Sequence, residues 1–142
     1  MRTKFLIADE VKPEPNGKQS VRGLFPDDTI ILSFPPNYTE TPGTPPPGMD
    51  LLTCMLSVAG LAPGKHKIKG QLLDPLGKLN AETPAVDFEV AKGNSHTFPF
   101  TLQPFIVSGG AGAYTWTFRV DERECTHAFS VRLLKSDGSD AE

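Results

Sequence analysis

The sequence predicts an all-β fold, a two-sheet antiparallel β-sandwich of about nine strands with an immunoglobulin-like arrangement. Three observations lead to this prediction. The 14 prolines and 13 glycines are spread along the 142 residues as breaks between short apolar runs, as turns are between strands. Several runs alternate apolar and polar residues, which is the period of a strand with one buried face. No stretch longer than one or two turns has helical periodicity, and no internal repeat is visible.

The N-terminal third predicts a hairpin followed by a buried strand. Residues 3–8 and 19–25 are strand candidates, and Asn16-Gly17 between them favours the positive φ of a tight turn. Pro26 to Asp28 interrupt the pattern, and residues 29–34 then form a third, mostly buried strand.

Strands with one apolar face continue to the end of the chain. The remaining candidates are residues 51–58, 65–73, 86–90, 97–102, 114–120 and 127–133. Alternation is strongest in the last two, whose inward side chains include Trp116, Phe118 and Phe129, so we expect these three rings between the sheets. Residues 74–77, with proline at the second position, and the charged residues 121–124 are expected turns.

Between the third and fourth strands, residues 35–48 read PPNYTETPGTPPPG. This segment has too much proline to donate sheet hydrogen bonds and is too long for an ordinary turn, so we expect a projecting loop. Its prolines restrict the backbone before a partner arrives, which reduces the entropy lost on binding. A tolerated surface insertion is the alternative. The candidate partner-binding residues are Pro36, Asn37, Tyr38, Thr39, Pro42, Pro45, Pro46 and Pro47.

Length and composition set the class of protein. A chain of 142 residues fits one domain, which we place at residues 1–135, with residues 136–142 as a polar tail. A content of 38% hydrophobic and 22% charged residues excludes disorder of the whole chain. With a net charge of −3, the protein has no global positive field for nucleic acid or an anionic membrane, so neither is an expected partner.

No targeting segment is apparent. The apolar run from Phe5 to Ala8 is shorter than the roughly 7–15 residues of a secretory signal, and no run reaches the roughly 18 that span a bilayer. We therefore expect a soluble, cytoplasmic protein. Cys54 and Cys125 could form an intersheet disulfide, but the tryptophan and tyrosine that accompany such a bond are not in the expected positions, so we expect free thiols.

The remaining constellations give no catalytic or cofactor site. Two cysteines and two histidines lie at strand positions whose side chains are expected to point inward, and four such ligands could bind zinc. These are Cys54, His66, Cys125 and His127. Because no local Cys-x-x-Cys pair is present, we expect buried, hydrogen-bonded histidines instead. Acidic side chains at strand ends could collect calcium, although turn caps are favoured; these are Asp9, Glu10, Asp27, Asp28 and Asp74. The glycine-rich residues 107–113 lack the ending of a P-loop, and no serine has a nucleophile-elbow motif. We expect no enzyme, no cofactor and no metal.

One family resemblance is carried by strand and turn motifs. They are ADEVKPE at residues 8–14, NGKQSV at 16–21, GLF at 23–25, DD at 27–28, PG at 63–64, LDP at 73–75, GK at 77–78 and the final hairpin. These resemble small bacterial proteins catalogued as a domain of unknown function. The resemblance covers most of the chain and departs from it at residues 35–48 and 121–124. It implies a bacterial or phage origin and a sandwich fold, and it transfers no functional residue.

The expected function is that of a non-catalytic interaction module presenting loops to a protein partner. The alternative is a structural or accessory subunit, such as a decoration subunit, of a bacterial or phage assembly, in which case the protein would be incorporated in a phage particle. Self-association in sizing measurements would favour the alternative. A small-ligand or carbohydrate binder comes last, because Tyr38 is the only aromatic residue we expect to be exposed.

Overall fold

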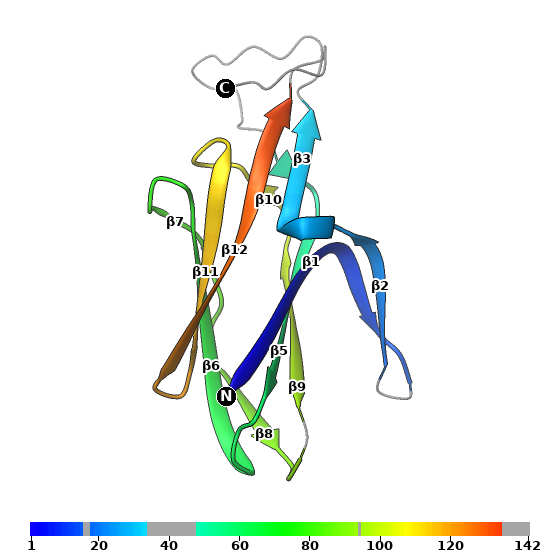
Figure 1. Ribbon diagram of the computed structural model, residues 1–142, viewed down its shortest axis with the longest axis vertical. Coiled ribbons are helices and arrows are strands. Elements are labelled where there is room, and N and C mark those ends of the chain that lie inside the picture. Colours follow the sequence, from blue (N-terminus) through cyan, green and yellow to red (C-terminus); the bar gives the residue numbers. More distant parts are fainter. Residues whose placement is uncertain (16–17, 34–47, 94, 135–142) are drawn as a thin grey trace.

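The computed structural model describes residues 1–15, 18–33, 48–93 and 95–134, and these residues fold as a β-sandwich (Figure 1). They form twelve strands and one short 3-10 helix, η1 (Pro26–Asp28). The predicted all-β sandwich is confirmed, with more strands than the nine expected. The additional strands are short, and they are β4 (Gly48–Met49), β7 (Leu79–Glu82) and β10 (Phe105–Ile106).

The first sheet has the strand order β2-β1-β5-β9. β1 (Arg2–Pro13) pairs with β5 (Leu52–Ala59) along its first half and with β2 (Gln19–Leu24) along its second half. β9 (His96–Leu102) lies on the other side of β5. The hairpin of β1 and β2 is the predicted one, although its Asn16-Gly17 turn lies outside the described residues. The part of this hairpin formed by β2 and the second half of β1 has no other strand beside it in the described part of the chain. It forms a two-stranded arm at the side of the sandwich (Figure 1).

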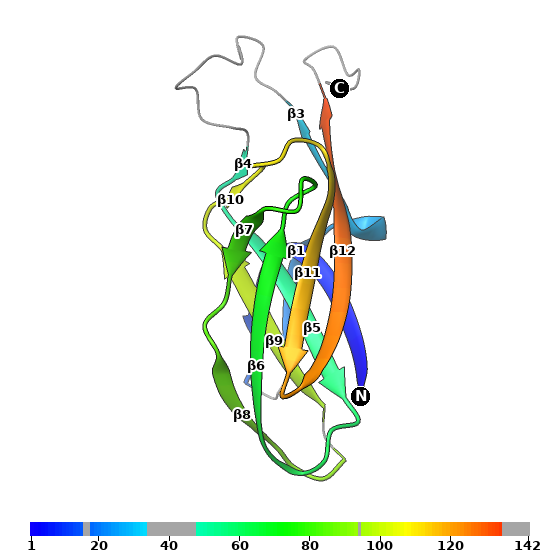
Figure 2. The ribbon, with the colours of Figure 1, turned by 90° about the vertical axis from the view of Figure 1, so that its left-hand side faces the viewer.

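The second sheet begins in the order β3-β12-β11-β6. β7 and β8 (Val86–Val90) follow one another along the outer edge of β6 (Gly64–Leu73), as Figure 2 shows. β11 (Gly112–Val120) and β12 (Arg123–Leu134) form the last hairpin. Val120 pairs with Arg123, so the turn contains only Asp121 and Glu122 and is shorter than the four-residue turn predicted.

Two features depart from the predicted arrangement of two antiparallel sheets. β3 (Thr29–Ser33) pairs in parallel with β12, because the chain crosses from the first sheet to the second through η1 and enters beside β12 in the same direction. β4 and β10 form a separate two-stranded sheet. Gly48, the last residue of the predicted loop, belongs to β4.

The core between the sheets is a stack of aromatic rings. Trp116 is fully buried, with its ring centroid 5.1 Å from that of Phe118 and 5.9 Å from that of Phe100. Phe129 is also buried and stacks on Tyr114 at 5.7 Å. The predicted placement of the three rings between the sheets is therefore confirmed. Gly70 leaves room for them, since a Cβ there would lie 2.9 Å from the ring of Phe118.

Candidate functional site

All of the predicted partner-binding residues, Pro36 to Pro47, lie outside the described residues. The structure does place the two points where their segment joins the sandwich. β3 ends at Ser33, paired with Leu134 at the end of β12, and β4 begins at Gly48, paired with Ile106 of β10. Both points lie at the upper end of the molecule in Figures 1 and 2. We call this end the anchor end and define it by β4, β10, the loop of residues 107–111, the turn of residues 74–78 and the start of β7.

A buried carboxylate fixes the turn of the anchor end. Oδ1 of Asp74 accepts hydrogen bonds from the backbone N–H groups of Leu76 and Lys78, both at 2.9 Å. The Oδ2 atom of Asp74 accepts a hydrogen bond from the Ser108 hydroxyl at 3.3 Å. The backbone carbonyl of Asp74 accepts one from the Gly77 N–H at 2.9 Å. The predicted turn at residues 74–77 is confirmed. The carboxylate of Asp74 acts as the turn cap that the sequence favoured.

Further hydrogen bonds hold the neighbouring loop, which already bonds to Asp74 through Ser108, to β7 and β11. The Asn80 amide donates to the Ile106 carbonyl at 2.7 Å and to the Ser108 hydroxyl at 2.9 Å. The Tyr114 hydroxyl donates to the Gly110 carbonyl at 2.8 Å. Because Ile106 also pairs with Gly48, these hydrogen bonds connect the turn, the loop and one attachment point of the proline-rich segment.

Two leucines extend from this hydrogen-bonded frame into solvent. Leu76 is 70% exposed and Leu79 is 54% exposed, which are high values for large apolar side chains. Asp74 already fixes the backbone of the turn that carries Leu76 and precedes Leu79, so this segment would lose little conformational entropy when a partner covered the two side chains. Sequence analysis did not single them out, because in the sequence they are ordinary residues in and after a turn.

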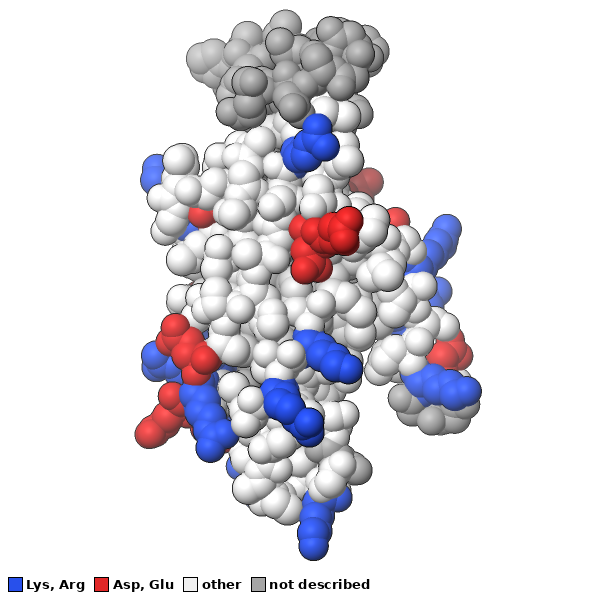
Figure 3. Space-filling model, in the orientation of Figure 1, with Lys and Arg blue, Asp and Glu red and all other residues white. Residues whose placement is uncertain are grey.

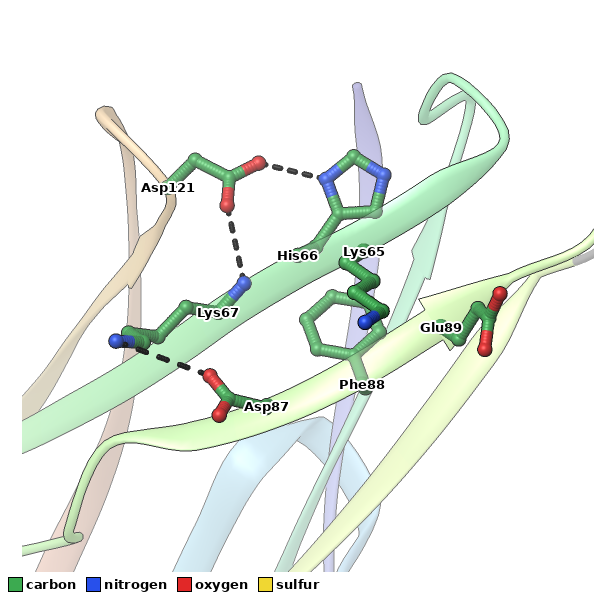
Figure 4. A pocket seen from close by; sticks show the side chains of 7 residues that line it. All are labelled: Lys65, His66, Lys67, Asp87, Phe88, Glu89 and Asp121. Atoms are coloured by element: carbon green, nitrogen blue, oxygen red, sulfur yellow. Dashed lines mark hydrogen bonds and ion pairs between the residues drawn. The ribbon is translucent and has the colours of Figure 1, made fainter.

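The opposite end of the sandwich contains a surface hollow of about 550 Å³ between β6 and β8 (Figure 4). Its lining residues are Lys65, His66, Lys67, Asp87, Phe88, Glu89 and Asp121. The charges have both signs, and Lys67 Nζ lies 3.8 Å from Asp87 Oδ1. The hollow therefore has no field of one sign that would select an anionic or a cationic ligand.

His66 and Asp121 form the closest pair of titratable groups in this hollow. His66 Nδ1 lies 2.6 Å from Asp121 Oδ2, and Nε2 lies 2.6 Å from the Ala62 carbonyl oxygen. Both neighbours are acceptors, so the protonated ring, in which both nitrogens donate, satisfies both contacts. The Asp121 carboxylate also accepts from the Lys67 N–H at 3.0 Å. The pair connects the β5–β6 loop to the β11–β12 turn, and both ring nitrogens of His66 are engaged by these neighbours.

We expect His66 to titrate above pH 6.5 and His127 below it. The hydrogen bond that His66 donates to Asp121, and then the one that it donates to the Ala62 carbonyl, hold the pKa of His66 above its ordinary value of 6.5. Burial lowers the pKa of His127, whose Nε2 lies 2.9 Å from Thr3 Oγ1. An NMR titration of the imidazole signals measures both. Asp121→Asn should lower the pKa of His66 and leave that of His127 in place; an unchanged His66 would contradict the pairing.

The same shifts set opposite dependences of stability on pH. The native state holds the His66 proton more tightly than the unfolded chain does, so its stabilisation is complete below pH 6.5 and is lost as pH rises through the raised pKa. His127 does the reverse, and its lowered pKa removes stability as pH falls below 6.5. The pKa of Asp121 is lowered by His66, so its contribution is present above pH 3.8 and is lost as pH falls through the lowered pKa. Urea unfolding of His66→Gln between pH 5 and 9 should lack the alkaline decline.

The residues weighed as zinc ligands are not brought together. Cys54 is buried in β5, Cys125 and His127 lie on β12, and His66 is bonded to Asp121. Across the described ranges, no group of three or more His, Cys, Asp or Glu side chains could hold a metal ion.

Both cysteines are free, and we expect them to react only slowly while the protein is folded. Burial raises the pKa of the Cys54 thiol to about 12, and burial also raises that of the half-buried Cys125. The thiolate is the reactive form, so little of it is present at neutral pH. A thiol reagent should leave Cys54 unlabelled in the native protein, label Cys125 slowly and label both at once in denaturant. Rapid native labelling of Cys54 would contradict its burial.

No protein-family model matches the chain, and no curated protein matches its sequence. Among the described residues, no helix is long and apolar enough to cross a membrane.

Proposed function

We propose that this protein is a non-catalytic interaction module that binds a protein partner through its anchor end. The observation that carries the proposal is the exposure of Leu76, on a turn fixed by the buried Asp74, and of Leu79, which directly follows that turn at the start of β7. The turn is connected to the point where the proline-rich segment re-enters the sandwich. Apolar side chains on a preordered backbone, connected to the point where a proline-rich segment joins the sandwich, suit a protein surface.

The strand order supports an immunoglobulin-like version of the sandwich. β1, β5 and β9 stand in the order of strands A, B and E, while β6, β11 and β12 stand in that of C, F and G. Domains of this architecture carry binding loops at the ends of a rigid scaffold. The polar groups that could suggest catalysis have structural contacts. The side chains of His66 and Asp74 form hydrogen bonds with neighbouring backbone and side-chain groups.

The second candidate is a structural or accessory subunit of a bacterial or phage assembly. The arm formed by β2 and the second half of β1 favours it, because every residue of β2 is exposed. A two-stranded hairpin without a packed face is only marginally stable in water, and a neighbouring subunit would stabilise it.

Two changes at the anchor end test the proposed function. One replaces residues 37–47 by a short Gly-Ser link, and the other combines Leu76→Ser with Leu79→Ser. A partner isolated from extract of the source cells is purified, and its dissociation constant is measured with each variant. Loss of a central contact costs more than about 1–2 kcal/mol, so we expect binding to weaken about tenfold or more.

Leu24→Ser is the matched control, because Leu24 is 57% exposed on β2, away from the anchor end. It should leave the dissociation constant unchanged. A partner that binds both anchor-end variants as tightly as the parent protein would move the contact surface elsewhere.

A further inference from the structure

The edge strands of the two sheets differ in how well they are protected from pairing with another chain. β9 contains Pro99, which has no N–H to donate. β8 presents Asp87 and Glu89 on its exposed face, and β2 carries Arg22 beside Gly23, whose φ is +68°. Prolines, charges and local distortions are the usual means by which soluble proteins keep edge strands apart.

β3 has none of these features. Its sequence, Thr-Ile-Ile-Leu-Ser, has no charge, proline or glycine and is rich in β-branched residues. Ile31 is 51% exposed on the outer face. In the described part of the chain β3 pairs only with β12, so its other side has no strand beside it (Figure 1). A short apolar edge in this condition is a template for a further strand.

The charges around β3 favour one relative orientation of two copies. The surface over the middle of β3 and β12 is largely uncharged, with an acidic group below it beside η1 and a basic one above it (Figure 3). The acidic residues that precede β3 are Asp27 and Asp28, while Arg132 lies on β12 beside Ile31. Arg132 is in register with Ile31, so in an antiparallel pair centred there it lies level with the axis in both copies and does not distinguish the two orientations. Asp27 and Asp28 precede β3 at one end only, and they do distinguish them.

Antiparallel pairing keeps the acidic residues of the two copies apart. At about 3.3 Å per residue, pairing centred on Ile31 separates the two acidic pairs by more than about 20 Å, well beyond the Debye length of about 8 Å at physiological salt. Parallel pairing would place the acidic residues of the two copies side by side. The charge pattern therefore selects the antiparallel arrangement.

We propose that two copies of this chain pair through β3, antiparallel about a two-fold axis at Ile31, so that their second sheets become one continuous sheet. A two-fold contact is closed, and it removes the unprotected edge of both copies at once. Five residues a side is far fewer than the roughly 20–30 of a standard interface, so the dimer is weak, with a dissociation constant on the order of 10–100 µM. The pairing is independent of partner binding at the anchor end, so a weak dimer through β3 does not by itself decide between the proposed function and the structural alternative; the anchor-end variants do.

Analytical ultracentrifugation from micromolar to several hundred micromolar concentration tests this proposal. We expect a reversible monomer–dimer equilibrium. Ile31→Lys places a charge opposite its own copy and should raise the dissociation constant at least tenfold, with an unchanged melting temperature. Leu24→Lys is the matched control, since Leu24 is similarly exposed but lies on β2, and it should leave the equilibrium unchanged.

A crosslink tests the register separately. Cα atoms directly opposite in an antiparallel pair lie about 4.5–5.5 Å apart, within the range that a disulfide spans. In a Cys125→Ser background, Ile31→Cys should therefore give a covalent dimer on mild oxidation, whereas Leu79→Cys should not. A protein that stays monomeric at all concentrations, or a dimer that persists in Ile31→Lys, would overturn the proposal, and in either case Leu76 and Leu79 would still be testable as partner contacts.

Discussion

Trp116→Ala should lower the free energy of unfolding by about 3–5 kcal/mol, a large part of the roughly 5–15 kcal/mol available to a domain of this size. The indole is fully buried between the two sheets and stacks on Phe118 and Phe100. Alanine would remove these contacts and leave a cavity that the flat neighbouring rings cannot fill. Urea unfolding followed by circular dichroism measures the loss without using the fluorescence of the deleted indole.

Trp116→Phe is the informative control for this position. Trp116 Nε1 is buried with no hydrogen-bond partner among the described residues, although it lies near enough to Cys54 to act on the pKa of its thiol. Phenylalanine keeps an aromatic ring and removes the unpaired N–H, whose burial is costly. We expect it to lose less than half of the stability lost by alanine. An alanine variant that unfolds at the parent's urea concentration would show that the ring is not in the core.

The sequence predicts the long strands of this fold well, because their pattern arises from local geometry. Side chains alternate across a strand, so the buried residues of β6 and β11 can be identified without any knowledge of their partners. β4 and β10 have only two residues each, too few for a pattern to appear. The pairing of β3 with β12 is equally hidden, since it joins residues about a hundred positions apart. The prediction that this strand is mostly buried is wrong, because Ile31 lies on the outer face of the sheet and is 51% exposed, whereas Ile30 is buried.

The candidate site was predictable only where its interactions are local. The turn at residues 74–77 follows from proline and glycine at fixed offsets, and the structure confirms it. The hydrogen bond from Ser108 to Asp74 spans 34 residues, and that between His66 and Asp121 spans 55. Such pairs depend on how the strands are ordered. For the same reason the sequence identified the carboxylate of Asp74 as a cap but not the frame to which it belongs.

Asp74→Ala should lower the free energy of unfolding by about 2–3 kcal/mol and should weaken partner binding further than this loss explains. The substitution leaves the N–H groups of Leu76 and Lys78 without their acceptor, and a donor left unpaired away from water costs about 1–3 kcal/mol. It also leaves a space beside Gly109. The carboxylate of Asp74 packs so closely on Gly109 that a Cβ at Gly109 would lie 2.8 Å from the carboxylate carbon. Denaturant unfolding measures the first effect, and the dissociation constant of the partner at a temperature where the variant is fully folded measures the second.

Two further variants separate the turn from the loop. Asp74→Asn retains an oxygen that can accept from both N–H groups, so we expect most of the stability and binding to remain. Ser108→Ala removes the hydrogen bond that Ser108 donates to Asp74 and the one that it accepts from Asn80, and it leaves the turn's own bonds intact, so its cost should be about 1–2 kcal/mol. The preordered position of Leu76 is the property that Asp74→Ala removes and Ser108→Ala retains. If both alanine variants bound the partner equally well while folded, the fixed turn would have no part in recognition, and the contact would have to come from the proline-rich segment alone.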